Sequence, residues 1–264
     1  MTWVSLVPVT ALALSLLFVA VYLFARKLDN YGIVDIFWAY AVAAVAAFYA
    51  IAGPGWPVRR ALLGAMVVVW GLRLGTHVWV RVTAHHPRED MRYQQLRKEW
   101  AAHLPQRMAW FFQMQAASIV ILGLTFLPST FNPMSALHPL EVAGTLLWLV
   151  AVSGEALADV QLAAFKRGPQ TQGSVCEAGL WHYSRHPNYF FEWLTWVAYF
   201  VFALASPWGW IAFIGPASIL YLLLRVTGTP MTEEQSLRSR GDAYRRYQRT
   251  TRAFVPWFPR KLGP

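Results

Sequence analysis

The sequence is poor in charge and almost without cysteine. Charged residues make up 14% of the 264 positions and hydrophobic residues 56%, whereas a soluble globular domain carries about 25% charged residues. This shortage of polar surface excludes an ordinary soluble domain. The single cysteine, Cys176, excludes an internal disulfide, and nothing in its surroundings indicates an activated thiolate. Repeats, low-complexity tracts and linkers are also missing, so we expect residues 1–264 to form one domain.

Long apolar runs dominate the rest of the chain. They cover residues 3–25, 33–52, 61–80, 108–127, 140–158, 189–205 and 208–224. Each is long enough, or nearly so, to cross roughly 30 Å of hydrocarbon as an α-helix. The first run has no basic residue before it and too long an apolar part to be a cleavable signal peptide. The sequence therefore predicts an all-α integral membrane protein with seven transmembrane helices.

The net charge of +10 follows the predicted membrane rather than a nucleic-acid surface. The connections expected to face inward hold most of the basic residues, namely Arg26, Lys27, six residues from Arg81 to Arg107, Lys166, Arg167, Arg185 and the tail from Arg238 to Lys261. The outward connections hold only Arg59 and Arg60. This positive-inside bias predicts an N-terminus outside and a C-terminus in the cytosol. Anionic membrane lipids account for part of the basic excess, and we expect no nucleic-acid partner.

Several charged residues lie inside the predicted membrane helices, near their cytosolic ends. Such a residue costs roughly 2.5–3.5 kcal/mol on insertion scales, so each needs a partner or a function. The second helix holds Asp35, the third spaces Arg73, His77 and Arg81 four residues apart on one face, and the fifth carries Glu155 and Asp159, with Lys166 two turns further on. An ion pair that pins helices together is one interpretation. Because these groups outnumber the pairs that they form, we favour a water-accessible pocket open to the cytosol.

The inward loop "RVTAHHPREDMRYQQLRKEW" holds two neighbouring histidines, His85 and His86. No third ligand stands at metal-binding spacing, so we expect no metal site. The same loop carries a dense polar run of Arg88, Glu89, Asp90, Arg92 and Tyr93. A solvated charge cluster is the alternative to a part in the pocket.

The stretch "GLWHYSRHPNYFFEW" places unusual polarity at the start of a membrane helix. Pro187 suits the first turn of a helix because its missing N–H costs nothing there, so we expect the sixth helix to begin near this residue. The free N–H groups and the positive dipole end of that turn favour a phosphate. Arg185 adds a planar fork for phosphate oxygens, and Tyr183 adds a ring and a hydroxyl.

Asn188 and Glu192 are four residues apart on one face of that helix. A carboxylate and an amide so placed can hold the carboxamide of a nicotinamide and accept from its NH2 group. The alternative is a plain helix cap with a tether between Arg185 and Glu192. The stretch "SRHPNYFFEW" alone leaves both interpretations open.

The same stretch resembles the signature of the steroid 5-alpha-reductase family and its bacterial relatives of unassigned function. The motifs "VDIFWAY", "WGLRLGTHVWVR", "REDMRYQQLR" and "EEQSLRSRGDAYRRYQ" resemble the same bacterial branch, so the resemblance covers nearly the whole chain. It implies seven helices in a bacterial inner membrane, NADPH bound on the cytosolic side, and reduction of a carbon–carbon double bond conjugated to a ketone. The implied substrate is a steroid of the 3-oxo-delta-4 type or another apolar lipid enone that enters from the bilayer.

The resemblance also implies roles for individual residues. Matched by position, the cofactor-binding residues are Asp159, Lys166, Tyr183, Asn188, Glu192 and Arg225. We add Arg81, Arg92 and Arg185, whose charges suit the pyrophosphate and 2′-phosphate of NADPH, and Tyr93 beside Arg92.

The resemblance implies that Asp35 is the carboxylate of the second helix that helps to polarise the substrate ketone. The steroid reductases carry a tyrosine in the third helix that binds this ketone, and Val78 stands at that place here. The candidates for its replacement are His77, Tyr31, Tyr40 and Tyr93, and we name Asp35 and His77 as the predicted catalytic residues. A donor aimed at the ketone oxygen matters most, because negative charge develops there when hydride reaches the β-carbon.

Two other functions compete with this one. The membrane methyltransferases that act on isoprenylated cysteine share "RHP" and the acidic, tyrosine-rich tail, and they use S-adenosylmethionine, which carries no phosphate. The arginines and lysines of the predicted pocket therefore favour NADPH. A non-enzymatic lipid-binding or scaffolding protein would leave the pocket groups without a task. In the tail we expect a helix capped by Thr232, with Glu233 and Glu234 placed to close the pocket.

Overall fold

The structure is a computed structural model of the chain, and it describes residues 2–168, 173–226 and 228–260. Within these ranges it is helical and holds no β-strand. The chain divides into two compact units. Unit 1 comprises Met1–His138 and Ala203–Ile214, and unit 2 comprises Pro139–Phe202 and Gly215–Pro264. The expectation of one domain stays a prediction.

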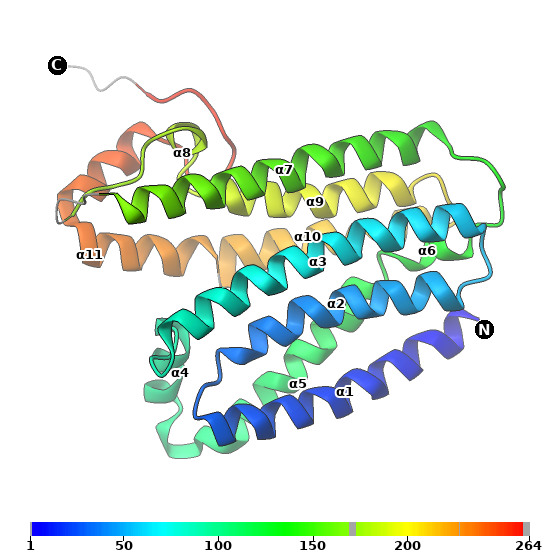
Figure 1. Cartoon of the computed structure of the whole chain (residues 1–264), viewed down its shortest axis with the longest axis horizontal. Coiled ribbons are helices and arrows are strands. Elements are labelled where there is room, and N and C mark those ends of the chain that lie inside the picture. Colours follow the sequence, from blue (N-terminus) through cyan, green and yellow to red (C-terminus); the bar gives the residue numbers. More distant parts are fainter. Residues whose placement is uncertain (1, 169–172, 227, 261–264) are drawn as a thin grey trace. The chain divides into compact units, whose positions relative to one another are not determined.

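Both units consist of helices, which Figure 1 labels in chain order. Unit 1 contains α1 (Trp3–Leu28), α2 (Ile33–Ala52), α3 (Pro57–His85), α4 (Met91–Glu99), η1 (Ala101–His103), α5 (Leu104–Gly123), α6 (Leu127–Phe131) and η2 (Gly209–Phe213). Unit 2 contains α7 (Pro139–Arg167), α8 (Leu180–Tyr183), α9 (Pro187–Ala203), α10 (Ile214–Tyr221), the π-helical η3 (Leu222–Val226) and α11 (Thr229–Thr250). Helical segments thus overlap every predicted apolar run, and α9 begins at the expected proline.

Five helical segments are long and apolar enough to cross a membrane. They are Trp3–Leu28, Ile33–Ala52, Pro57–Ala84, Pro139–Arg167 and Gly209–Thr250. The last one joins an apolar stretch that ends at Val226 to the strongly charged α11, so only its first part suits hydrocarbon. Helix α9 has 17 residues, and α5 carries Gln106, Gln113 and Gln115, which lower its mean hydropathy. The chain is therefore a multi-pass membrane protein in which five of the predicted crossings are supported by the helices.

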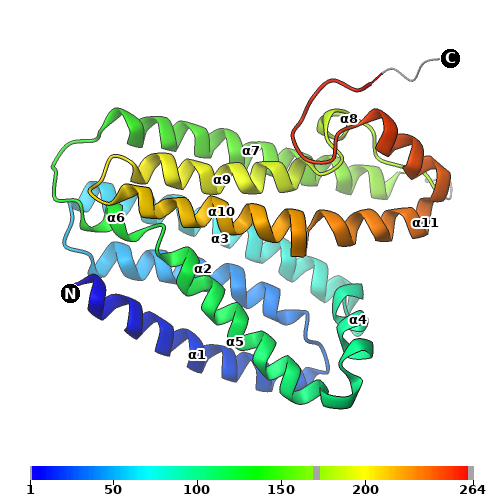
Figure 2. The same ribbon diagram turned by 180° about the vertical axis from the view of Figure 1, so that it is seen from behind.

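Helices α2 and α3 pack closely because small residues line their contact. A Cβ added to Gly71 would lie 2.7 Å from the Cβ of Ala43, and one added to Gly75 would lie 2.5 Å from the ring of Tyr40. Small residues let helix backbones approach each other, which favours packing in a membrane. Helix α2 also contacts α1 and α5. This packing places the first turn of α2, which carries Asp35, at the end of unit 1 where α4 lies (Figure 2).

The two arginines of the predicted outward connection bind backbone carbonyls. Arg59 is 1% exposed, and its guanidinium donates to the carbonyl oxygens of Asn132, Met134 and Ala136 at 2.7–3.0 Å. Arg60 Nη1 donates at 2.6 Å to a carbonyl oxygen in the last turn of α2, where the helix itself offers no donor. Both side chains therefore stabilise the turn between α2 and α3.

In unit 2, α7 and α9 run side by side in antiparallel directions (Figures 1 and 2). A Cβ added to Gly144 would lie 2.7 Å from the backbone nitrogen of Phe202, and one added to Gly154 would lie 2.5 Å from the ring of Phe191. These glycines permit the close approach of the two helices. Because the directions are opposite, the first turns of α9 lie beside the last turns of α7.

The C-terminal helix departs from the prediction in two respects. It begins at Thr229 after Gly228, so the predicted cap is wrong: the Thr232 hydroxyl donates to the Gly228 carbonyl at 3.0 Å from inside the helix. Helix α11 is also kinked at Gly241, where φ is 54° and ψ is −125°. A residue with a side chain rarely adopts this conformation, so glycine permits the kink. The part of α11 after the kink turns toward α8 (Figure 2).

Candidate functional site

The predicted site residues fall into both units. Unit 1 holds Asp35, His77, Arg81, Arg92 and Tyr93, and unit 2 holds Asp159, Lys166, Tyr183, Arg185, Asn188, Glu192 and Arg225. In unit 1 the structure brings Asp35, Arg92 and Tyr93 together. In unit 2 it joins Arg185 to the C-terminal helix. The structure therefore shows two separate polar clusters, one in each unit.

Asp35 and Tyr93 form a hydrogen-bonded pair at the start of α2. The Tyr93 hydroxyl donates to Asp35 Oδ1 at 2.8 Å, and Arg92 Nη1 lies 4.0 Å from the same oxygen. Tyr93 is fully buried, whereas the Asp35 side chain is 26% exposed. Burial raises the pKa of Tyr93 well above its ordinary value, and the charge of Asp35 raises it further. The tyrosine therefore stays protonated and holds a partly open carboxylate in place.

A buried ion pair holds α4 against the turn between α1 and α2. The Glu89 carboxylate is buried, and it accepts from Arg97 Nε at 2.6 Å and from the backbone N–H of Tyr31. Arg97 also lies 2.9 Å from the Asp29 carboxylate, with its Cζ 4.5 Å from the centroid of the Tyr31 ring. A buried charge is costly to leave unpaired, so these groups fix one another. The polar loop is thus packed against the turn between α1 and α2, where it positions Tyr93, and it is more than a solvated charge cluster.

The structure distinguishes the tyrosines that the sequence leaves as replacements for the one missing at Val78. Tyr93 contacts Asp35 directly. Tyr40 shares a hydrogen bond of 3.2 Å with a threonine of α3, and Tyr31 belongs to the contact that holds α4. Tyr93 and Asp35 are 58 positions apart in the chain, so helical spacing gives no sign of their contact.

The basic face of α3 shows a different arrangement. The side chains of His77 and Arg81 are exposed, and Arg73 is half-buried. Arg81 Nη2 lies 4.0 Å from the carboxylate of Asp90. This carboxylate also accepts from the backbone N–H of Arg92, in the first turn of α4, at 3.1 Å. An exposed ion pair of this kind contributes about 0–1 kcal/mol. The structure thus gives Asp35 its partners on α4 rather than at His77.

Arg185 and Glu233 form the centre of the cluster in unit 2. Arg185 Nε donates to Glu233 Oε1 at 2.9 Å, and Nη2 donates to Oε2 at 3.0 Å, which makes a bidentate pair. The two side chains are 11% and 14% exposed. Arg185 Nη1 donates to the backbone carbonyls of Gln248, at 3.2 Å, and Thr251. All three nitrogens of the guanidinium thus donate to protein groups, which favours a positioning role for Arg185, and its predicted phosphate contact stays a prediction.

Glu233 accepts further hydrogen bonds from side chains that sequence reasoning missed. His186 Nε2 lies 2.8 Å from Oε1, the Tyr244 hydroxyl donates to the same oxygen at 2.8 Å, and Gln248 Nε2 donates to Oε2. Burial favours the neutral carboxyl, but the hydrogen bonds from His186, Arg185 and Gln248 outweigh it and hold the pKa of Glu233 well below its usual range. Tyr244 and Gln248 are four apart in the tail, a spacing that marks one helix face.

The two glutamates predicted to close the pocket differ. Glu233 binds the loop before α9, whereas Glu234 is exposed and pairs with Arg238 of the next turn at 2.6 Å. The structure contradicts the alternative interpretation, a tether between Arg185 and Glu192. Arg185 pairs with Glu233, and Glu192 accepts from a tryptophan of α9 at 3.0 Å.

The backbone of the signature loop is also bound by the tail. The buried Tyr247 hydroxyl donates to the carbonyls of Trp181 and, at 3.2 Å, Ser184. Ser184 Oγ donates to the carbonyl oxygen of Phe254 at 2.8 Å. Buried backbone groups outside a helix need such partners. Hydrogen bonds with the tail, at Tyr247 and Phe254, therefore stabilise the conformation of the loop that leads into α9.

The first turns of α9 carry polar atoms that the protein leaves unsatisfied. Within the part of the chain that the structure describes, the buried atoms Asn188 Oδ1 and Trp193 Nε1 have no hydrogen-bond partner. Leaving such an atom unpaired costs about 1–3 kcal/mol. Asn188 Oδ1 is therefore ready to accept an N–H group of a ligand, and Trp193 Nε1 is ready to donate.

The other predicted cofactor residues of unit 2 lie toward the ends of helices. On α7, Asp159 is half-buried and Lys166 is exposed in the last turn. Arg225 is exposed on the π-helical η3, a rare form that is frequent at functional sites. Tyr183 is 39% exposed, and its ring packs edge-on to Phe258 with the centroids 6.0 Å apart. The side chains of Lys166, Tyr183 and Arg225 are thus accessible to a ligand.

A family model described as "Protein of unknown function (DUF1295)" matches the chain. The match covers residues 21–251, a range that includes every predicted site residue. Neither a curated protein nor a solved structure matches the chain.

Proposed function

The chain belongs to the DUF1295 family, and from that premise we propose that it is a membrane-embedded, NADPH-dependent reductase of the carbon–carbon double bond of an enone. Its substrate is an apolar lipid or steroid that enters from the bilayer. Support comes from the resemblance of "GLWHYSRHPNYFFEW" and the other motifs to steroid 5-alpha-reductases. In this proposal the seven crossings follow from the apolar runs and the bacterial inner membrane from the resemblance. The positive-inside bias supports an N-terminus outside with the cofactor side in the cytosol.

The pair of Asp35 and Tyr93 is the observation that carries the proposal. Reduction of an enone builds negative charge on the ketone oxygen, and a donor aimed at that oxygen supplies the main stabilisation. Asp35 is the partly exposed member of the pair, so we assign it to the substrate, and the buried Tyr93 holds its orientation. In the proposed reaction the carboxyl group of Asp35 is the donor aimed at the ketone oxygen.

The proposed reaction adds one hydride and one proton to the double bond, while a second proton is lent by Asp35 and returned to it. NADPH, when bound, supplies the hydride that forms the new C–H bond at the β-carbon. The π electrons of the double bond move toward the α-carbon and the ketone oxygen, where the Asp35 proton neutralises the developing charge. The enol then returns this proton to Asp35 as the α-carbon takes up a proton from water, so the saturated ketone leaves the pair unchanged.

The polar groups of unit 2 fit the cofactor. The unsatisfied Asn188 Oδ1 would accept from the carboxamide NH2 group of a nicotinamide. The exposed Lys166 and Arg225 suit phosphate oxygens. Arg185 holds the loop before α9, so it supports the site without touching the cofactor.

One observation favours a second candidate, an S-adenosylmethionine-dependent methyltransferase of the isoprenylcysteine type. The bidentate pair of Arg185 with Glu233 removes one cation from the set that suits the phosphates of NADPH. Adenosylmethionine needs no such cation. The two candidates therefore differ in the nucleotide that the protein binds.

Calorimetry on the purified protein tests the proposal directly. We expect NADPH to bind more tightly than NADH, because only NADPH carries the 2′-phosphate, and we expect no binding of adenosylmethionine. A 3-oxo-delta-4 steroid added with NADPH should gain two hydrogens, as read by mass spectrometry of the product. Equal affinity for the two nicotinamide cofactors contradicts the proposal, and tight binding of adenosylmethionine alone supports the methyltransferase.

A further inference from the structure

A cavity of about 430 Å3 opens on the outer face of α5 in unit 1. It is lined by Trp100, Gln106, Arg107, Trp110, Phe111 and Met114. The last four residues follow helical spacing and share one face of α5. Met108 and Phe112, on the other face, are fully buried. The cavity therefore lies outside the packed core of unit 1.

The lining changes from polar to apolar along α5. Arg107 is in the first turn, Trp110 lies one turn further and is 68% exposed, and Met114 follows after another turn. Helical rise places Arg107 and Met114 roughly 10 Å apart along the axis. Residues 116–123, "AASIVILG", are almost wholly apolar, so this half of α5 suits hydrocarbon. Exposed tryptophans favour the depth of the headgroups, so we expect the half that carries the cavity to lie there and the crossing predicted over residues 108–127 to begin later.

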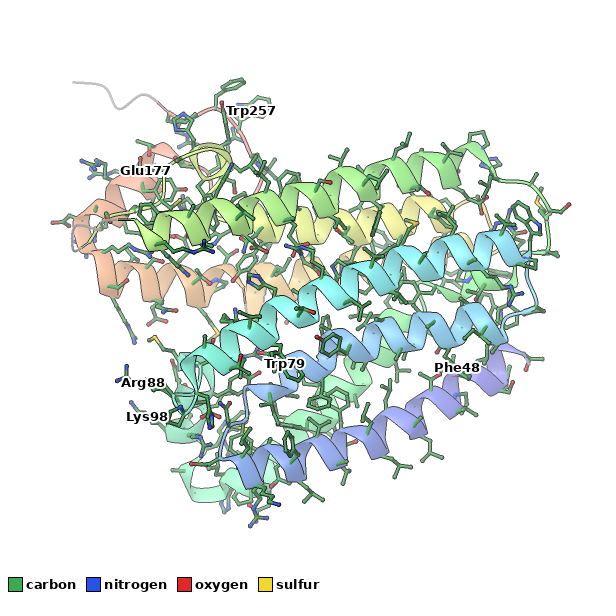
Figure 3. All side chains as sticks on the ribbon, in the orientation of Figure 1. Phe48, Trp79, Arg88, Lys98, Glu177 and Trp257 are labelled. Atoms are coloured by element: carbon green, nitrogen blue, oxygen red, sulfur yellow. The ribbon has the colours of Figure 1, made fainter. Side chains whose placement is uncertain are left out.

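The charge around the cavity is basic. Arg107 is exposed at its polar end, and the Cζ of Arg92 lies 5.4 Å from the centroid of the Phe111 ring. Lys98 does not line the cavity, but it is exposed in the last turn of α4 (Figure 3), two positions before the lining residue Trp100. The neighbouring Glu99 accepts from a glutamine of α4 at 2.8 Å. Glu99 keeps its negative charge, and Arg92 lies 4.0 Å from Asp35. The positive charge that remains therefore comes from Arg107 and Lys98. A guanidinium at the rim suits a phosphate.

We propose that this cavity is a binding site for an anionic phospholipid, with the phosphate at Arg107 and the upper part of an acyl chain against Trp110 and Met114. A lipid fits because the site joins a cation to an apolar wall about 10 Å deep at the membrane boundary. The Phe111 ring also packs edge-on to Tyr93, with the centroids 6.2 Å apart. A bound lipid therefore supports the wall behind the Asp35 cluster, whatever reaction that cluster performs.

Native mass spectrometry of detergent-solubilised protein tests the site. The probes are phosphatidylglycerol and phosphatidylcholine, which differ in net charge. We expect the wild-type protein to retain one phosphatidylglycerol in preference to phosphatidylcholine, and Arg107→Gln to bind it about tenfold more weakly, equivalent to about 1.4 kcal/mol. Arg246→Gln is the matched control, because Arg246 is an exposed arginine of α11 far along the chain. It removes the same charge and should retain the lipid.

Two further measurements define the failure of the proposal. Trp110→Ala should weaken retention, whereas Trp79→Ala, at a tryptophan of α3 that is 54% exposed (Figure 3), should leave it unchanged. Equal loss in both arginine variants, or equal retention of both lipids, overturns the proposal. Displacement of the lipid by millimolar inorganic phosphate assigns the site to a free anion and also overturns it. If Arg107→Gln fails to fold, as judged by circular dichroism, the two tryptophan variants decide.

Discussion

The Glu233 hub and the pair of Asp35 and Tyr93 differ in how many hydrogen bonds the protein donates to the carboxylate. The Glu233 hub consists of Glu233 and the side chains that bind it, those of Arg185, His186, Tyr244 and Gln248. Glu233 receives hydrogen bonds on both oxygens from Arg185, His186 and the tail of the chain. Asp35 receives one hydrogen bond from Tyr93 and has an arginine at 4.0 Å, and its side chain stays 26% exposed.

This difference gives Glu233 a structural role, whereas Asp35 can still bind a ligand. A carboxylate offers about four lone-pair sites. In Glu233 the protein occupies them, so the residue fastens α11 to the loop before α9. In Asp35 most of them stay open toward the surface of unit 1. Substitutions at the two carboxylates should therefore separate stability from activity.

The largest effect is expected for Glu233→Gln. A neutral amide leaves the Arg185 guanidinium, which is 11% exposed, without its counter-charge, and breaking a pair so largely shielded from water costs up to about 3–5 kcal/mol. Thermal unfolding in detergent, followed by circular dichroism, should show a clear fall in Tm. Glu234→Gln is the matched control and should change the free energy of unfolding by less than about 1 kcal/mol, because Glu234 is exposed. Equal melting of the two variants would show that the hub contributes no stability.

The next effect concerns turnover. Asp35→Asn should lower the rate of enone reduction by about 10²-fold or more, because the amide of asparagine can donate a hydrogen bond but cannot give up its proton to the ketone oxygen. NADPH affinity and Tm should stay near the wild-type values. Asp242→Asn, at a carboxylate that is 95% exposed, is the control and should reduce the enone normally. A joint fall of Tm and NADPH affinity in Asp35→Asn would make Asp35 a structural group like Glu233.

A smaller effect is expected at the kink that brings the tail back to the hub. Gly241→Ala should lower the free energy of unfolding by about 1–3 kcal/mol, because alanine is strained at the φ and ψ of this residue. A Cβ at this position meets no atom within 4 Å, so the cost comes from the backbone alone. Gly168→Ala, where an added Cβ makes only ordinary contacts, should change Tm little. An unchanged Tm in Gly241→Ala would show that the kink is unstrained.

The smallest effect is a dependence of stability on acid. The pKa of Glu233 is lowered in the folded state, so its contribution is fully present above the ordinary value of 4.5 and is lost as the pH falls toward the folded value. Between pH 7 and pH 4 this single group should account for about 0.8 kcal/mol of lost stability. The difference between wild type and Glu233→Gln isolates it, because all other carboxyls titrate in both proteins. A constant difference across this range would contradict the lowered pKa.

Much of the helical layout was predictable from the sequence. Apolar runs locate the helices because the hydrocarbon core excludes polar residues over a fixed length. The start of α9 at Pro187 follows from the chemistry of a first helical turn. The cap at Thr232 was predicted wrongly, because Gly228 and the preceding π-helical segment move the start of α11 upstream.

The composition of the two clusters was visible in the sequence, but their pairing was not. Asp35, Tyr93, Arg185 and Glu233 all lie in motifs that stand out by their polarity. Helical periodicity shows which residues share one face of one helix, and it is silent about partners 48 or 58 positions away.

The sequence by itself determined the class of protein, the positions of its helices and the set of polar groups, because these follow from local hydropathy and spacing. Only the tertiary structure decided which carboxylate is open and which is occupied. That choice depends on the packing of α4 against the start of α2 and on the kink at Gly241, which returns Tyr244 and Gln248 to Glu233. Such contacts arise from the whole fold, since no local pattern encodes the distance between residues that meet only after the chain has packed.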